Sequence, residues 1–184
     1  MGPLSLSEFE GVQTSRLDSS NDIRGTFFKF EPEKLLNHDI GTVAVSINPT
    51  IGTIRGLHFQ IEPFAEEKIV TCLQGSVFDV IVDIRQNSKT FGRWSSFELN
   101  SKNGLQVFLP KGIAHGFQVL QSNSIIHYCL TSTYSKVDAF SINPFGDLEI
   151  NWPLKSSAIS DRDANGMELS EASLRYSASL ENLQ

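Results

Sequence analysis

The stretch KIVTCLQGSVFDVIVDIR, residues 68–85, contains two apolar runs separated by Gln74-Gly75. Both runs are rich in Val, Ile and Phe, which favour β-strands, and the Gln-Gly pair is typical of a turn. Seven similar runs surround this pair: GTFFKF, TVAVSI, GTIRGLHF, RWSSFEL, LQVFL, GFQVL and SIIHYCL. About nine short strands at this spacing, with Gly, Pro and Asn between them, predict an all-β fold.

Helical periodicity is convincing only in PEKLLN near the start and in the tail after Met167. We therefore expect short N- and C-terminal helical segments on a jelly roll whose mouth holds a ligand. With 184 residues, the chain fits one domain over 1–184. We expect its last ten residues, which are polar and Ser-rich, to fray.

Composition excludes several classes of protein. The net charge of -6 argues against a nucleic-acid binder, which usually has a basic face. No apolar run reaches the ~20 residues of a membrane helix, and no N-terminal stretch resembles a signal peptide. Cys72 and Cys129 lie inside apolar runs and are interpreted as reduced core thiols. These features predict a cytoplasmic protein.

The segment RGLHFQ, residues 55–60, introduces chemistry into a predicted strand. Side chains alternate along a strand, so His58 and Gln60 share one face while Leu57 and Phe59 take the other. A single strand histidine is more often structural than functional. Four further groups, however, lie on separate segments: Lys68, His115, Tyr128 and Asp163. A base, a cation, a phenol and a carboxylate together favour proton transfer next to a carbonyl.

A metal site is the next possibility. The stretch from Gly104 to His115 resembles the second motif of the cupin superfamily, whose paired motifs usually supply three histidines and a glutamate. Here Gln60 stands where the first motif needs its second histidine, and the later ligand position near Val119 is apolar. Only His58 and His115 remain, and Zn or Fe sites usually want at least three protein ligands. We expect a metal-free cupin-type jelly-roll barrel.

Seven motifs in order carry a resemblance to one family: RGLHFQ, the lysine ten residues after His58, VFDVIVDIR, SKTFGRW, PKGIAHGF, INWP and SDRD. Over residues 22–165 the chain resembles the dTDP-4-dehydrorhamnose 3,5-epimerase family, which leaves 166–184 as a tail. The resemblance implies a homodimer that inverts C3, C5 or both in a nucleoside-diphosphate 4-keto-6-deoxyhexose, without a cofactor, in deoxysugar biosynthesis.

The resemblance also implies roles for single residues. His58 matches the general base, Asp163 the carboxylate that orients it, and Tyr128 the general acid. Lys68 and His115 match groups around the keto oxygen. The substrate-binding positions implied are Arg24, Arg55 and Arg162 at the diphosphate, Tyr134 against the nucleobase, and Phe27, Lys29 and Gln60.

Departures from the family pattern concern the nucleotide. Lys29 stands where the family usually has a glutamate that contacts the base. Val43 and Val45 align with positions that are often polar, and Thr71 replaces a frequent arginine. The nucleotide could therefore be dTDP, UDP, GDP or CDP, and the sequence does not name the carbons inverted.

Other interpretations stay open at this point. Tyr128 could be an ordinary strand aromatic, and Lys68 a solvated edge residue. Asp79 and Asp83 could be satisfied barrel carboxylates or partners of His115. His38 and His127 are expected to be structural or exposed. The alternative functions are a 3,4-ketoisomerase on the same fold and a non-catalytic cupin that binds sugar nucleotides.

Overall fold

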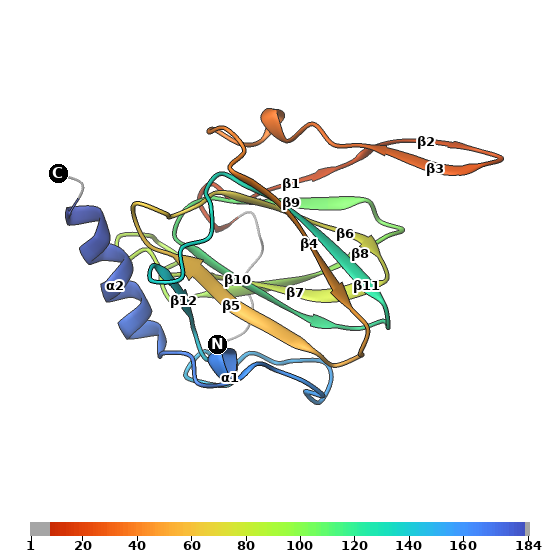
Figure 1. The fold of residues 1–184 in the computed structure, drawn as a ribbon. Helices are drawn as coiled ribbons and strands as arrows, with labels where there is room; N and C mark the ends of the chain where they lie inside the picture. The colour runs from red at the N-terminus through yellow and green to blue at the C-terminus, as the bar shows by residue number, and fades with distance from the viewer. Residues whose placement is uncertain (1–7, 183–184) are drawn as a thin grey trace.

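The structure, a computed structural model, describes residues 8–182. This part of the chain forms two five-stranded antiparallel sheets that pack face to face, with a two-stranded hairpin projecting from them (Figure 1). One sheet has the order β1 (Gln13–Arg16), β9 (Leu105–Leu109), β6 (Lys68–Gln74), β11 (Ser124–Leu130), β4 (Thr42–Asn48). The other has the order β12 (Ala139–Ser141), β5 (Ile54–Gln60), β10 (Ile113–Val119), β7 (Ser76–Asp83), β8 (Trp94–Asn100). The hairpin consists of β2 (Asp18–Asp22) and β3 (Gly25–Lys29).

All nine predicted runs are strands, which confirms the all-β fold and its jelly-roll architecture. The sequence did not predict β1, β2 and β12. The first two, QTSR and DSSND, are polar, and the third is only the tripeptide AFS. Pairing with neighbouring strands, rather than local propensity, makes these segments extended.

The predicted C-terminal helix is confirmed as α2 (Leu169–Glu181). Its residues Ala172 and Tyr176, one turn apart, are buried in the main apolar cluster, and Arg175 lies 5.0 Å from the ring of Phe140. The expectation that the last ten residues fray was wrong up to Glu181, because this packed face holds the helix on the barrel. Residues 183–184 lie outside the described part.

Near the start, the predicted helix PEKLLN is only a short 3-10 helix, η2 (Pro32–Lys34). Leu36, just after it, packs with Ile69 and Phe108 on the outer face of a sheet. A second helix, α1 (Asp161–Ala164), was not predicted from the sequence. Within residues 8–182, no helix has the length and apolarity needed to cross a bilayer.

Strand β5 shows the predicted alternation of faces. Leu57 and Phe59 are buried in the apolar core, whereas His58 and Gln60 face the opposite side. Gly56 lies directly against Gly116 on β10, and a Cβ added to Gly56 would come within 2.6 Å of the Gly116 Cα atom. This close approach of β5 and β10 requires glycine.

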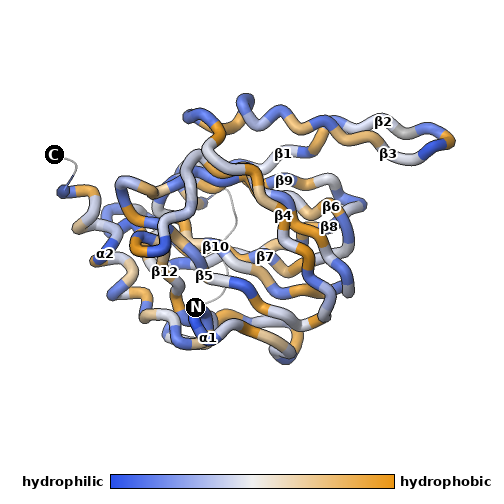
Figure 2. The backbone as a smooth tube through the Cα atoms, viewed as in Figure 1, coloured by the Kyte–Doolittle hydropathy of each residue, from blue (hydrophilic) through white to orange (hydrophobic). Residues whose placement is uncertain are grey.

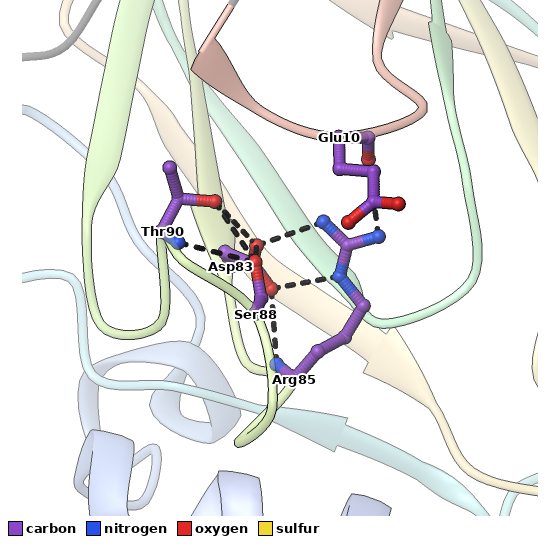
Figure 3. Close-up of polar contacts among 5 residues, drawn as sticks. All are labelled: Glu10, Asp83, Arg85, Ser88 and Thr90. Carbon is purple, nitrogen blue, oxygen red and sulfur yellow. Dashed lines mark hydrogen bonds and ion pairs between the residues drawn. The ribbon is translucent and has the colours of Figure 1, made fainter.

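Asp83 is a structural carboxylate at the end of β7 (Figure 3). It is fully buried and accepts hydrogen bonds from Arg85 Nε at 2.9 Å, Ser88 Oγ at 2.6 Å and Thr90 Oγ1 at 2.7 Å. Arg85 also donates to the Glu10 carbonyl at 3.1 Å. Burial alone would raise the pKa of Asp83, but the hydrogen bonds from Arg85, Ser88 and Thr90 lower it below its ordinary value. Of the two roles left open by the sequence, a barrel carboxylate or a partner of His115, Asp83 therefore has the first, with its hydrogen bonds satisfied by Arg85, Ser88 and Thr90.

We expect Asp83→Ala to lower the free energy of unfolding by about 3 kcal/mol, because it leaves a partly buried guanidinium and two hydroxyl groups without their acceptor. The lowered pKa means that the carboxylate stabilises the fold above its ordinary pKa of about 4 and that this contribution is lost as the pH falls. Urea titrations at pH 7 and pH 3 measure both effects. The control Asp39→Ala removes an exposed aspartate, and a similar loss in both variants would contradict this assignment.

Candidate active site

A cavity of about 400 Å³ opens between the two sheets. Eight of the twelve candidate residues line it: Arg55, His58, Gln60, Lys68, His115, Tyr128, Tyr134 and Arg162. Asp163 lies directly behind His58, and the other three candidates lie on the projecting hairpin. The structure therefore brings nine of the twelve predicted residues to one place.

His58 and Asp163 form a hydrogen-bonded pair. The Nε2 atom of His58 lies 2.7 Å from Asp163 Oδ1, which also accepts from Ser141 Oγ at 2.9 Å. The Gly56 N–H donates to the other carboxylate oxygen at 3.1 Å. A carboxylate can only accept here, so Nε2 carries the proton and Nδ1 keeps its lone pair. This arrangement makes Nδ1 of His58 the candidate base.

The charge state of Asp163 supports this tautomer. Burial alone would raise the pKa of Asp163, but the hydrogen bond and charge of His58, together with the Gly56 N–H and the Ser141 hydroxyl, lower it to about 2. Asp163 belongs to α1, and its backbone N–H donates to the Oγ atom of the N-cap residue Ser160 at 3.1 Å. Asp163 is therefore ionised at neutral pH and fixed in place.

His115 pairs with a different carboxylate. Its Nε2 atom lies 2.8 Å from Asp79 Oδ2, and both side chains are buried. Burial raises the pKa of Asp79, against the opposing effects of His115 and Lys68. Within residues 8–182 the other carboxylate oxygen of Asp79 has no hydrogen-bond partner. Of the interpretations left open for Asp79, the structure favours a partner of His115.

Tyr128 faces the cavity from β11, on the sheet opposite His58. Burial, and then the charge of Asp79, raise the pKa of Tyr128 above its ordinary value, so the hydroxyl keeps its proton at neutral pH. Its ring lies edge-on to His115, with 6.3 Å between the centroids. A protonated phenol in the cavity wall can donate a proton, which an ordinary strand aromatic facing the core could not.

The two remaining histidines lie outside this cavity. His127 points to the opposite face of β11, where its ring is 4.8 Å from that of Phe30 and burial lowers its pKa. His38 is exposed on a loop, with its Nδ1 atom 3.2 Å from Glu67. These positions agree with the structural or exposed roles expected from the sequence.

Lys68 is a buried cation. Its side chain is only 6% exposed, and its Nζ atom lies 3.2 Å from Glu66 Oε1. The alternative of a solvated edge lysine is therefore wrong. The sequence did not single out Glu66 or Ser141. Alternation along the chain puts residues 66 and 68 on one side and could have indicated Glu66, whereas Ser141 is adjacent to Asp163 only in the fold.

Aromatic and basic groups surround the mouth of the cavity. Arg162 donates to the Tyr134 hydroxyl at 3.0 Å, and Arg55 donates through Nε to Asn48 Oδ1 at 2.7 Å. Arg55, Tyr134 and Arg162 are exposed. They are therefore accessible from solvent, and their contacts with a diphosphate and a nucleobase stay predictions.

Arg24, Phe27 and Lys29 lie on the β2–β3 hairpin, which projects from the two sheets (Figure 1), and they do not belong to the described residues that line the cavity. The hairpin carries apolar as well as polar segments (Figure 2), and Phe27 is 65% exposed. Their substrate-binding role stays a prediction. Among residues 8–182, the hairpin pairs with itself and with no strand of the barrel.

The described residues, 8–182, offer no cluster of metal ligands. In that part, no three or more His, Cys, Asp or Glu side chains are grouped as metal ligands would be. His58 and His115, the two remaining cupin positions, are each paired with an aspartate. That the reaction needs no metal stays a prediction.

Comparison with known proteins adds to this geometry. The family model for dTDP-4-dehydrorhamnose 3,5-epimerase matches residues 7–171. A dTDP-4-dehydrorhamnose 3,5-epimerase from Sinorhizobium fredii is 36% identical over 181 residues, which cover 94% of this chain and 91% of that protein.

Two solved structures share the fold over most of the chain. A dTDP-6-deoxy-D-glucose-3,5-epimerase from Legionella pneumophila, in complex with dTDP-4-keto-L-rhamnose, has a TM-score of 0.82 and 34% identity over 88% of this chain and 89% of its own. A 3'-monoepimerase from Streptomyces bikiniensis, in complex with dTDP-quinovose, has a TM-score of 0.80 and 31% identity over 100% of this chain and 90% of its own.

Proposed function

Since the chain belongs to the dTDP-4-dehydrorhamnose 3,5-epimerase family, we propose that His58 and Tyr128 exchange protons with the two faces of a 4-keto sugar held in the cavity. The protein is an epimerase that acts on a nucleotide-linked 4-keto-6-deoxyhexose. One observation carries the proposed mechanism: the base and the acid come from opposite sheets, His58 on β5 and Tyr128 on β11, and both face the same cavity.

The first step is removal of a proton next to the ketone. A carbonyl at C4 acidifies the hydrogens at C3 and C5. Nδ1 of His58 takes one of them. The C–H electron pair then forms a double bond to C4, and the π electrons of the carbonyl move to O4, which becomes an enolate oxygen. The ammonium group of Lys68 and the ring of His115 stabilise that charge. Asp163 stabilises the imidazolium form of His58.

The second step is return of a proton on the other face. Tyr128 donates its phenolic proton to the same carbon, which inverts the configuration and restores the ketone at C4. The phenolate and the imidazolium ion then return to their starting states by proton exchange with water. The hydroxyl is protonated when the substrate arrives, as a proton donor must be, and its raised pKa makes it a weaker acid than a free phenol.

We propose that the mouth of the cavity holds a nucleoside diphosphate. Arg55 and Arg162 suit the two phosphates because guanidinium groups donate in pairs to phosphate oxygens. Tyr134 is 65% exposed beside Arg162, which suits it to stack on a nucleobase. Relatives in complex with dTDP-4-keto-L-rhamnose and dTDP-quinovose support a dTDP sugar as the substrate.

We also propose a homodimer in which the hairpin of one subunit reaches the cavity of its partner. This arrangement would bring Arg24, Phe27 and Lys29 to a substrate that their own chain does not offer them. Two surfaces support it: the exposed Phe27 on the hairpin, and the exposed row Val43, Val45 and Ile47 on edge strand β4. Exposed apolar patches of this kind are typical of protein interfaces.

The proposed cellular location is the cytoplasm. Cys72 and Cys129 are both buried and unpaired. Burial raises the pKa of both thiols, that of Cys72 to about 11, so neither is a reactive thiolate. Two free core thiols suit a reducing compartment.

We expect Lys29→Glu to shift nucleotide preference toward dTDP by about tenfold relative to CDP, because N3 of cytosine carries no hydrogen to donate. A carboxylate can accept the N3–H of thymine, whereas an ammonium group can only donate, and a mispaired polar group costs about 1–3 kcal/mol. Calorimetric titration with the four nucleoside diphosphates measures the shift. Lys89→Glu, the same charge change on an exposed loop, is the control. The same nucleotide preference in wild type, Lys29→Glu and Lys89→Glu, or a monomer in sedimentation experiments, would contradict the proposal that the hairpin reaches the partner's cavity.

Deuterium uptake tests the activity and identifies the substrate. The protein is incubated in heavy water with 4-keto-6-deoxyhexoses linked to dTDP, UDP, GDP or CDP. The mass of each sugar nucleotide is then measured by mass spectrometry. The proposal predicts a mass gain of one or two units for the dTDP sugar. Tight binding of every nucleotide without any uptake would instead indicate a binding protein.

A further inference from the structure

Glu66 places a second charge inside the cavity, next to the cation that faces the substrate. Its side chain is only 11% exposed and lines the cavity. One carboxylate oxygen lies 3.2 Å from Lys68 Nζ, and the other accepts a hydrogen bond from Gln60 Nε2 at 2.9 Å. Both oxygens of Glu66 are therefore engaged by protein groups before any ligand arrives.

Gln60 holds Glu66 in place. Its Nε2 atom also lies 3.1 Å from the Phe64 carbonyl and 3.2 Å from the Thr133 carbonyl, while its Oε1 atom accepts from the Ser135 N–H at 2.8 Å. Gln60 is buried, and all its polar atoms have protein partners. The amide thus holds Glu66 rather than offering a free group to a sugar.

The surroundings of Lys68 explain why a partner carboxylate matters. An unpaired ammonium group is costly to bury, and a long flexible side chain has many conformations. Charged and titratable groups on five other elements face the same space: Asp79 on β7, His115 on β10, Tyr128 on β11, His58 and Arg55 on β5, and Arg162 on α1. Asp79 forms its ion pair with His115 while its charge also acts on Lys68, and the arginines repel a cation. Glu66 is the carboxylate in contact with Lys68.

We propose that Glu66 is a positioning residue for epimerisation: held by Gln60, it keeps the ammonium group of Lys68 aimed at the keto oxygen. The inference rests on the proposed function, in which Lys68 stabilises the enolate. That charge develops only in the transition state, so loss of Glu66 lowers kcat more than it raises KM.

The test compares two adjacent glutamates. In Glu66→Gln the side-chain oxygen cannot serve both Lys68 and Gln60, so we expect kcat to fall about 10- to 100-fold while KM changes by less than about threefold. Glu67→Gln is the matched control, because Glu67 points away from the cavity and binds the N–H and side-chain amide of Asn37 at 2.9 and 2.8 Å. Its kcat should stay within about twofold of wild type. Melting temperatures of both variants show whether stability explains any loss.

A double-mutant cycle shows whether Glu66 acts through Lys68. Lys68→Met removes the cation, so adding Glu66→Gln should cause no further loss of kcat. Multiplying losses would overturn the inference, as would an unchanged kcat in Glu66→Gln, or a raised KM with normal kcat, which would mean that Glu66 binds substrate directly. Wild type that turns over none of the 4-keto sugar nucleotides would overturn the proposed function itself. Active wild type with a fully active Glu66→Gln would overturn only this inference.

Discussion

Turnover should fall about a thousandfold or more in a His58→Asn variant, with the fold retained. Asparagine keeps much of the size and polarity of histidine, and its amide can still donate to Asp163. It cannot accept a carbon-bound proton at neutral pH, so the variant lacks the proposed base. Epimerisation followed by NMR gives the rate, and circular dichroism checks the fold.

His38→Asn is the matched control for this variant. His38 is exposed on a loop and does not line the cavity. Its substitution should leave kcat within about twofold of wild type, because most surface substitutions have small effects. If His58→Asn retained turnover within about tenfold of wild type, His58 could not be the base.

Tyr128→Phe should separate exchange from inversion. Loss of the hydroxyl leaves proton removal by His58 possible, but blocks return of a proton from the opposite face. We expect inversion to slow about a hundredfold or more. Deuterium should still enter the unchanged substrate in heavy water, because His58 can return a solvent-derived deuteron to the face it deprotonated.

Tyr134→Phe separates the two cavity tyrosines. Tyr134 lies at the mouth and accepts a hydrogen bond from Arg162. Loss of its hydroxyl should raise KM with little effect on inversion, because the substitution affects nucleotide binding alone. If Tyr128→Phe inverted the sugar at the wild-type rate, the donor would be another group, and Tyr134 would be the first candidate.

Much of the fold follows from residue patterns. The nine apolar runs form strands because, in an extended segment, alternating apolar residues share one face that can be buried in the core. Segments without that pattern, such as the polar β1 and β2, depend on partners that are distant in sequence. For the tail, the sequence predicted the helix but not its order near the end. The polar composition suggested fraying, whereas Ala172 and Tyr176 pack α2 on the barrel.

The site was predicted where residue chemistry is unusual for its setting. A histidine, a lysine and a tyrosine on predicted strands stand out, and the structure places His58, Lys68 and Tyr128 around one cavity. Ser141 could not be identified in this way, because its importance comes only from contact with Asp163, which lies 22 residues away. The direction of the hairpin, and hence the place of Lys29, depends on how whole segments pack, which local pattern does not encode.

Position-resolved proton NMR of a dTDP-linked 4-keto-6-deoxyhexose, incubated with the wild-type protein in heavy water, shows whether this cavity catalyses epimerisation. We expect the signals at C3, C5 or both to disappear as deuterium enters, the configuration at those carbons to invert, and the carbonyl to stay at C4. A carbonyl that moved to C3 would indicate a ketoisomerase. Complete retention of both proton signals, with the nucleotide bound, would contradict catalysis by this cavity.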